Sequence, residues 1–327
     1  MSSTAIKNRS EQKFMPIYLE SLRLDSILDF DLYIKVNDQL VLYRSENLPF
    51  TDRTLRKLVN NRLDRLYVAF DNKRNYQRYI EKNLDKILAD PKVQEEKKAS
   101  ILYETSTNLV KDVLNNPTYG ENIQRSRDLV TQTVNFILKG REAFLSLLTI
   151  TSFDYYTYTH SVNVCTFSIA LAQRMGFKDE QFLHELGIGS LLHDVGKSRI
   201  SDRILNKRGS LTPIEFEIMK KHPKWGVQIL EESELMEPAS MYPVLQHHER
   251  GDRRGYPQSL SLDEMHIYSK IVSIADSFDA MTTDRVYQRA MGSFPALKIM
   301  FTLKGAYDEQ ILNLFVELMG PTSLADI

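Results

Sequence analysis

Hydrophobic and polar residues largely alternate over residues 31–44, DLYIKVNDQLVLYR, on either side of Asn37 and Asp38. Alternation places the apolar side chains on one face of an extended strand. Asn and Asp tolerate the positive φ that a type I′ turn requires, so this segment predicts a β-hairpin.

The residues after the hairpin predict further short elements. Thr51 and Asp52 predict a helix start before LRKLV. RLYVAF, residues 65–70, is a β-prone run, and NYQRYIEKNLDKIL predicts an amphipathic helix. Together these elements indicate a small α+β accessory or regulatory domain over residues 14–90, after a disordered tail of residues 1–13.

The pattern becomes helical after Pro91. Apolar residues recur at helix-face spacings over residues 91–150, and Asn115-Asn116-Pro117 separates two helices. One interpretation is a helical linker that packs on its neighbours, and the other is a helix pair that forms a homodimer or transmits a signal. The remaining residues, 151–320, have helical periods and no convincing strand, so we expect a mainly α fold.

The composition is that of a globular protein and excludes several classes of function. The 42 Lys and Arg residues nearly balance the 43 Asp and Glu residues, so no global field favours a nucleic-acid polymer. The single cysteine, Cys165, excludes an internal disulfide and suits a reducing compartment. The N-terminus lacks a signal-peptide core, and no uncharged apolar run approaches the roughly 18 residues of a membrane span. We therefore expect a cytoplasmic protein without a membrane span.

All seven histidines follow residue 159, and one of them, His193, directly precedes Asp194. His193 and Asp194 follow the run 188–192, which predicts a buried helix segment for both. A buried imidazole and carboxylate are costly unless they are neutralised, and a pair of metal ions does this. Asp276 follows the equally apolar KIVSIA, so an all-α bundle would project these side chains inward. Lys197, four residues after His193, would lie on the same helical face and hold an anionic substrate.

These residues resemble the HD-GYP phosphodiesterases, a subclass of the HD superfamily of metal-dependent phosphohydrolases. The resemblance runs from roughly Asp154 to Leu318 through several motifs in order: HSVNV, LLHDVGKSRI, ILNKRGSLTPIEFEIMKKHPKWG, HHERGDRRGYP and ADSFDAMTTDRVYQRAM. It implies an all-helical HD-GYP bundle over residues 151–320. It also implies hydrolysis of cyclic di-GMP, a bacterial second messenger, to pGpG and in some members to GMP.

The resemblance also assigns roles to individual residues. It implies two divalent metal ions, iron or manganese, with Asp194 bridging them, and these metal ligands: His160, His193, Asp194, His222, His247, His248 and Asp276. Lys197 would contact the scissile phosphate, Tyr256 would line the substrate pocket, and Arg285 would hold substrate phosphate or guanine. Asp194 and Lys197 are thus the expected catalytic residues. Two such metals would lower the pKa of a shared water towards neutrality. We expect Glu249 and Asp279 to support the site rather than to bind metal, and assign no role to His184 and His266.

The sequence departs from the family at four positions. Tyr156 stands where some members carry a Glu that supports a third metal, so we expect two metals. Arg253 replaces a usual Gly, and it costs about 1–2 kcal/mol if its φ is positive. Val286 and Gln288 replace a usual proline and a usual basic residue. These changes leave two alternatives open, a catalytically impaired cyclic-dinucleotide receptor that signals through protein partners of the N-terminal domain, and a phosphohydrolase for another cyclic dinucleotide.

Overall fold

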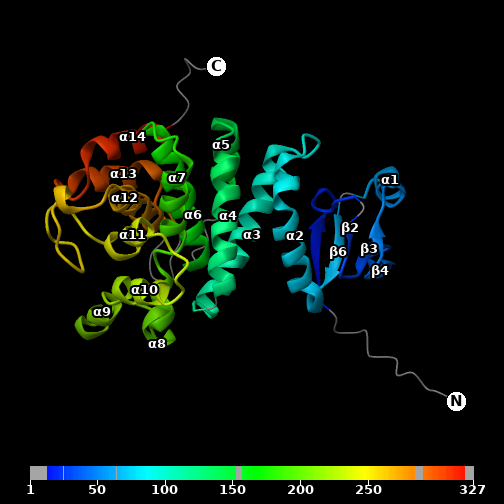
Figure 1. Ribbon diagram of the computed structural model, residues 1–327, viewed down its shortest axis with the longest axis horizontal. Helices are drawn as coiled ribbons and strands as arrows, with labels where there is room; N and C mark the ends of the chain where they lie inside the picture. Colours follow the sequence, from blue (N-terminus) through cyan, green and yellow to red (C-terminus); the bar gives the residue numbers. More distant parts are fainter. Residues whose placement is uncertain are drawn as a thin grey trace. The chain divides into compact units, whose positions relative to one another are not determined.

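The computed structural model describes residues 13–24, 26–63, 65–118, 120–151, 157–283 and 290–320. The chain divides into two compact units, residues 1–101 and 102–327. The boundary falls inside one helix, α3 (Glu95–Asn115), which begins in the first unit and continues into the second (Figure 1).

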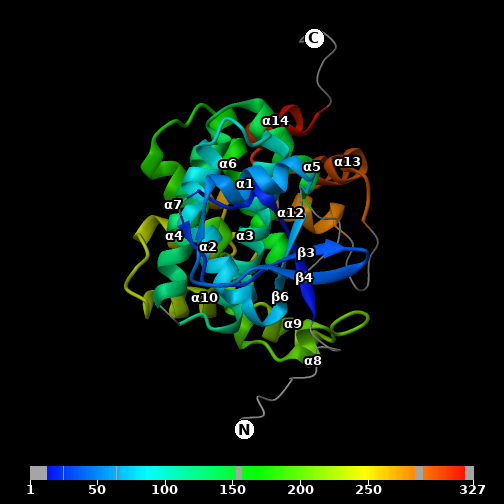
Figure 2. The ribbon, with the colours of Figure 1, turned by 90° about the vertical axis from the view of Figure 1, so that its right-hand side faces the viewer.

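The first unit contains an antiparallel sheet of four strands in the order β1-β6-β3-β4. Their bounds are β1 (Phe14–Tyr18), β3 (Leu32–Val36), β4 (Gln39–Arg44) and β6 (Arg65–Ala69). β3 and β4 lie side by side as the predicted hairpin (Figure 2). Asn37 and Asp38 adopt φ of 48° and 63°, which confirms the turn expected from these two residue types.

Two helices complete the first unit. α1 (Asp52–Asn60) begins where predicted, because the Thr51 side chain accepts a hydrogen bond from the backbone N–H of Thr54. α2 (Lys73–Ala89) is the predicted amphipathic helix, and its Tyr76 and Tyr79 pack edge-on against Phe30 in the core. The predicted α+β class is thus confirmed, although the sequence pattern missed β1 and a second, two-stranded sheet formed by β2 (Ser26–Ile27) and β5 (Pro49–Phe50).

Three helices, not two, occupy the described residues of the range 91–150. α3 ends at Asn115, as predicted, and α4 (Gly120–Ile137) and α5 (Arg141–Ile150) follow. The break between α4 and α5 is at Gly140, whose φ of 130° is accessible to glycine and not to other residues at low cost. α4 packs against α7 (Glu180–Leu191), and its apolar residues are buried. That burial favours the interpretation in which these helices pack on their own neighbours.

The rest of the second unit is the helical bundle expected from the sequence. α6 (Thr157–Arg174) packs against α7, α12 (Ile267–Thr282) and α14 (Glu309–Met319). The shorter helices are α8 (Asp202–Leu205), α9 (Pro213–Met219), α10 (His222–Glu231), α11 (Met241–Gln246) and α13 (Ser293–Thr302). Within the described part of this unit, β pairing is limited to one bridge between Asp252 and Ser261. Among the helices of the described residues, none combines the length and apolar character needed to cross a membrane.

Candidate metal centre

The bundle brings the seven predicted ligand residues together from five parts of the chain. His160 lies on α6 and Asp276 on α12, as the helical patterns predicted. The other five follow helix ends, His193-Asp194 after α7, His222 after α9 and His247-His248 after α11. All are buried except His248, which is half-buried.

The predicted helical placement of His193 and Asp194 was wrong. α7 ends at Leu191, the two residues form a turn, and Lys197 lies in a short 3₁₀ helix, Val195–Arg199. The turn lets the backbone at Gly196 approach α10 so closely that a Cβ there would lie 2.5 Å from Gly226 N and still nearer to the His222 carbonyl oxygen. Lys197 therefore does not share a helical face with His193. It nevertheless reaches the site, where its Nζ donates to Asp194 Oδ2 at 2.5 Å.

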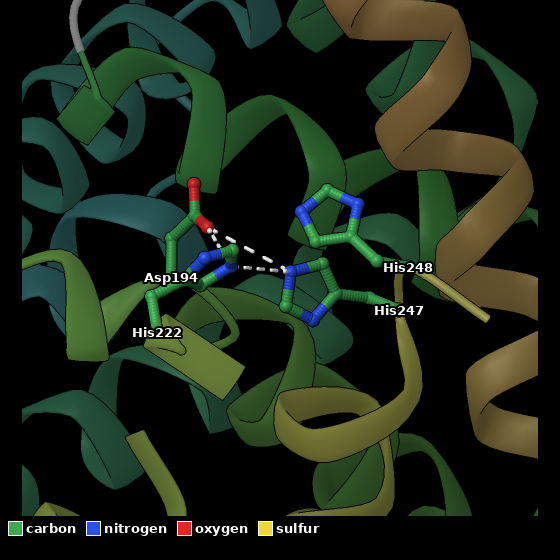
Figure 3. Close-up of side chains that lie close together, drawn as sticks. All are labelled: Asp194, His222, His247 and His248. Carbon is green, nitrogen blue, oxygen red and sulfur yellow. Dashed lines mark hydrogen bonds and ion pairs between the residues drawn. The ribbon is translucent and has the colours of Figure 1, made fainter. Parts of the chain in front are cut away.

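The ligand side chains form two groups on either side of the Asp194 carboxylate. Asp194 Oδ1 lies 3.3 Å from His222 Nε2 and 3.7 Å from His247 Nε2. Figure 3 shows this oxygen turned toward both imidazoles, with His248 beyond them. Asp194 Oδ2 faces the other group, 3.4 Å from His193 Nε2 and 3.8 Å from His160 Nε2. One carboxylate thus presents a separate oxygen to each group.

Asp276 completes the second group and connects it with the first. Its Oδ1 lies 3.0 Å from His160 Nε2, and its Oδ2 lies 3.8 Å from His248 Nδ1. Burial alone would raise the pKa of Asp276, yet its hydrogen bond with His160 and the nearby imidazoles hold that pKa well below the usual range. The carboxylate is therefore held ionised inside the bundle.

Backbone carbonyls fix three of the imidazoles in one tautomer. The Nδ1 atoms of His193, His222 and His247 lie 2.7, 2.8 and 2.9 Å from the carbonyl oxygens of Ser190, Met219 and Pro243. A carbonyl only accepts, so each Nδ1 carries the proton and each neutral ring directs its Nε2 lone pair into the site. Three rings are thus oriented as metal ligands.

The lone pairs and charges fit a cation. His222 Nε2 and His247 Nε2 lie 3.1 Å apart with both protons on the far side of the rings, so two lone pairs face each other. His193 Nε2 and Asp194 Oδ1 are buried and lack a hydrogen-bond partner among the described residues. Burial alone would raise the pKa of Asp194, yet the Lys197 ammonium beside it holds that pKa well below its usual range. Nitrogen and oxygen donors of this kind suit divalent iron, manganese or zinc.

Asp279 supports His160, which answers a question that the sequence left open. His160 Nδ1 lies 2.6 Å from Asp279 Oδ2, and a carboxylate oxygen can only accept this bond. Nδ1 therefore carries a proton, and Nε2 is the ring nitrogen of His160 that faces Asp276 and Asp194. Asp279 is three residues after Asp276 on α12, so both carboxylates share one face of the helix.

The loop that follows His248 places Tyr256 beside the ligands. The rings of Tyr256 and His248 are 4.7 Å apart between centroids, and the Tyr256 backbone N–H donates to the carbonyl of His248 at 3.2 Å. Glu249 is buried and accepts from the backbone N–H groups of Gln258 and Leu260 at 2.5 and 2.9 Å. A Cβ at Gly255 would lie 2.5 Å from the Glu249 Cα, so the loop requires glycine there. Glu249 therefore closes the loop that carries Tyr256.

Arg253 has the positive φ, 62°, at which a side chain is strained. Its guanidinium is exposed and pairs with Glu264 at 2.9 Å, so this contact directs it to the protein surface. Arg285 lies outside the described residues, as do Tyr156, Val286 and Gln288. His184 and His266 belong to neither ligand group. His184 Nε2 lies 3.2 Å from the carbonyl of Arg127, and His266 caps α12.

Comparison with known proteins agrees with this arrangement. The model of the HD domain family matches residues 146–311. The chain belongs to the HD domain family. The matched HD domain contains all seven residues of the two ligand groups.

Relatives of this HD domain chain include named enzymes. A cyclic di-GMP phosphodiesterase of Pseudomonas aeruginosa is 36% identical over 193 residues, which cover 59% of this chain and 46% of that protein. A cyclic di-GMP phosphodiesterase of Thermotoga maritima is 39% identical over 174 residues, which cover 50% of this chain and 45% of that protein. The match thus spans less than half the length of these curated relatives. The solved structure of Bd1817, an HDG"Y"P protein of Bdellovibrio bacteriovorus, is similar at a TM-score of 0.65 and 26% identity, and covers 94% of this chain and 99% of that chain.

Proposed function

We propose that this chain hydrolyses cyclic di-GMP to pGpG, with cleavage to GMP as a second step. The observation that carries the proposal is the Asp194 carboxylate, whose two oxygens face two separate groups of imidazole lone pairs. This geometry supports a pair of divalent metal ions, iron or manganese, with Asp194 as the shared ligand. The named activity of the relatives supports cyclic di-GMP as the substrate.

Each group would hold one metal ion. His222, His247 and His248 would bind one, and His160, His193 and Asp276 would bind the other. When bound, such ions polarise a phosphodiester and lower the pKa of a coordinated water.

The chain's own side chains would bind and orient the substrate. Lys197 is half-buried and its ammonium lies against the shared carboxylate, a position that supports contact with a phosphate oxygen next to the metals. Tyr256 packs beside His248 and offers an aromatic face at the half-exposed side of the site. Arg285 is proposed as a further phosphate or guanine contact on the family resemblance.

The proposal is tested by turnover of the metal-loaded full chain. We expect Mn²⁺- or Fe²⁺-loaded protein to convert cyclic di-GMP to pGpG, followed by chromatography. Asp194→Asn and His193→Ala should each lower turnover by more than about 100-fold, since even residues that only support a metal ligand cost about 10–100-fold. Asp308→Asn, which changes a carboxylate that caps α14, is the matched control and should keep the activity. Equal turnover in the wild type and both site variants overturns the assignment.

The same assay separates the alternatives from the proposal. Tight binding of cyclic di-GMP without product would indicate a receptor, and preferential cleavage of 3′,3′-cGAMP would indicate a different cyclic-dinucleotide specificity. Arg253 gives neither alternative direct support, because its side chain pairs with Glu264 at the surface. Homodimerisation through residues 91–150 and protein partners of the N-terminal domain are further hypotheses, which sedimentation of the full chain and of residues 102–327 would test.

A further inference from the structure

A chain of buried hydrogen bonds extends from His160 away from the metal centre. Asp279 accepts from His160 Nδ1 through Oδ2 at 2.6 Å and from Asn163 Nδ2 through Oδ1 at 2.8 Å. The Tyr103 hydroxyl donates to Asn163 Oδ1 at 2.9 Å. The exposed fractions of the four residues are 1% for His160, 2% for Asp279, 1% for Asn163 and 8% for Tyr103.

The Asp279 carboxylate determines the donor and the acceptor of every hydrogen bond in this network. A carboxylate donates nothing, so both groups that contact Asp279 must be donors. The Asn163 amide therefore presents its NH₂ to Asp279 and its oxygen to Tyr103, and the tyrosine must donate. His160 in turn must hold a proton on Nδ1, so Nε2 is the ring nitrogen available to a metal ion. If the amide of Asn163 turned over, its oxygen would oppose the carboxylate, so the Tyr103 hydroxyl secures the orientation that Asp279 needs.

We propose that Tyr103 and Asn163 are positioning residues for the metal centre, acting through Asp279 to hold His160 in its metal-binding tautomer. This inference rests on the metal-binding part of the proposed function. Neither residue belongs to the two ligand groups, and Tyr103 lies on α3, before the matched HD domain begins at residue 146. Tyr103 would therefore support the metal centre from a helix that lies outside the residues matched by the family model.

The experiment compares two tyrosines that each lose only a hydroxyl group. Tyr103→Phe removes the donor to Asn163, and Tyr268→Phe removes a similarly buried tyrosine's bond to Glu185 Oε2, at 2.8 Å, which is unconnected to the ligands. Mn²⁺ is titrated into full-length protein freed of metal by chelation, and ¹⁵N shifts of the imidazoles report the His160 tautomer without metal.

We expect Tyr103→Phe to weaken Mn²⁺ binding by about tenfold, the lower end for residues that support a ligand, and to give a mixed His160 tautomer. Tyr268→Phe should change neither. Asp279→Asn should weaken binding by about 10–100-fold, and Tyr103→Phe should add nothing further in that background, because both act through one chain. Asp279→Asn also serves as the second variant if Tyr103→Phe does not fold.

The outcomes separate the network from the metal centre itself. A wild-type protein that binds no Mn²⁺ overturns the metal centre and with it the proposed function. Normal wild-type binding that is unchanged in Tyr103→Phe, or that falls equally in Tyr268→Phe, overturns the positioning role alone. Additive losses in the Tyr103 and Asp279 double variant would also overturn it.

Discussion

Gly196→Ala should separate two ligands of the centre without changing either of them. A Cβ at position 196 would lie 2.5 Å from Gly226 N and 2.9 Å from the His222 carbonyl carbon, and still closer to its oxygen. Ordinary contact begins at 3.4 Å, so the 3₁₀ helix and α10 must move apart by at least 0.9 Å, the difference between 3.4 and 2.5. The obstacle is backbone, which cannot rotate away. His222 heads α10 and its Nε2 lies 3.3 Å from Asp194 Oδ1, so the same movement opens the centre.

We expect Gly196→Ala to change both the stability of the protein and its affinity for Mn²⁺. Overpacking should lower the free energy of unfolding by about 1–3 kcal/mol, measured by urea denaturation. A displacement of about 1 Å at a site costs about 100-fold, so Mn²⁺ affinity should fall by up to that factor. Gly292→Ala is the matched control, because a Cβ there meets nothing nearer than Pro295 Cδ at 3.6 Å. If Gly196→Ala binds Mn²⁺ as tightly as the control, the close approach does not set the ligand geometry.

Three further outcomes follow from the structure. Arg253→Gly should raise the free energy of unfolding, measured by urea denaturation. It relieves about 1–2 kcal/mol of backbone strain at φ 62° and loses an exposed ion pair worth about 0–1 kcal/mol. A lower urea midpoint would contradict this expectation. Glu249→Gln should lower the free energy of unfolding by about 1–3 kcal/mol, because its amide NH₂ would face one of the two backbone N–H donors. An unchanged urea midpoint would refute the proposal that Glu249 closes the loop that carries Tyr256. Metal-free protein should lose stability in urea as the pH falls from 7 to 5. Burial and neighbouring imidazoles hold the pKa of His247 well below 6.5 and lower that of His248 to about 3. Between pH 7 and 5 these two histidines therefore take up protons only in the unfolded chain, which lowers the free energy of unfolding. A free energy of unfolding that does not change over this pH range would exclude this linkage.

The sequence predicted the features that depend on local pattern. The hairpin followed from alternation around Asn37 and Asp38, and the positive φ of both residues bears it out. His193, Asp194 and Asp276 stood out because they follow apolar runs, and the burial of all three agrees with that pattern. The other four ligand residues were expected from the family resemblance. The family resemblance, which has a usual Gly at this position, made strain at Arg253 an expectation if φ is positive, and φ is 62°.

Features that depend on contacts distant in sequence were not predictable. Tyr103 and Asn163 are 60 residues apart, and Asn163 and Asp279 are 116 apart, so no local pattern relates them. The turn at His193 was mistaken for helix because the apolar run before it fits a helix. After α7 ends at Leu191, the turn brings Gly196 against α10, and this contact with a later segment leaves no local pattern. β1 was missed because it is short and contains Pro16, a residue type depleted in strands.

The tautomers of three ligand histidines follow from their positions relative to helix ends. His193, His222 and His247 each follow the end of a helix, and each Nδ1 donates to a carbonyl three or four residues earlier, in the last turn of that helix. Carbonyls of a last helical turn have spare acceptor capacity, so one bond both caps the helix and turns Nε2 outward from it. His160 is inside α6 rather than after a helix end, and its Nδ1 donates to the Asp279 carboxylate instead. The position of a ligand relative to its helix end therefore decides whether the backbone or a distant side chain must orient it.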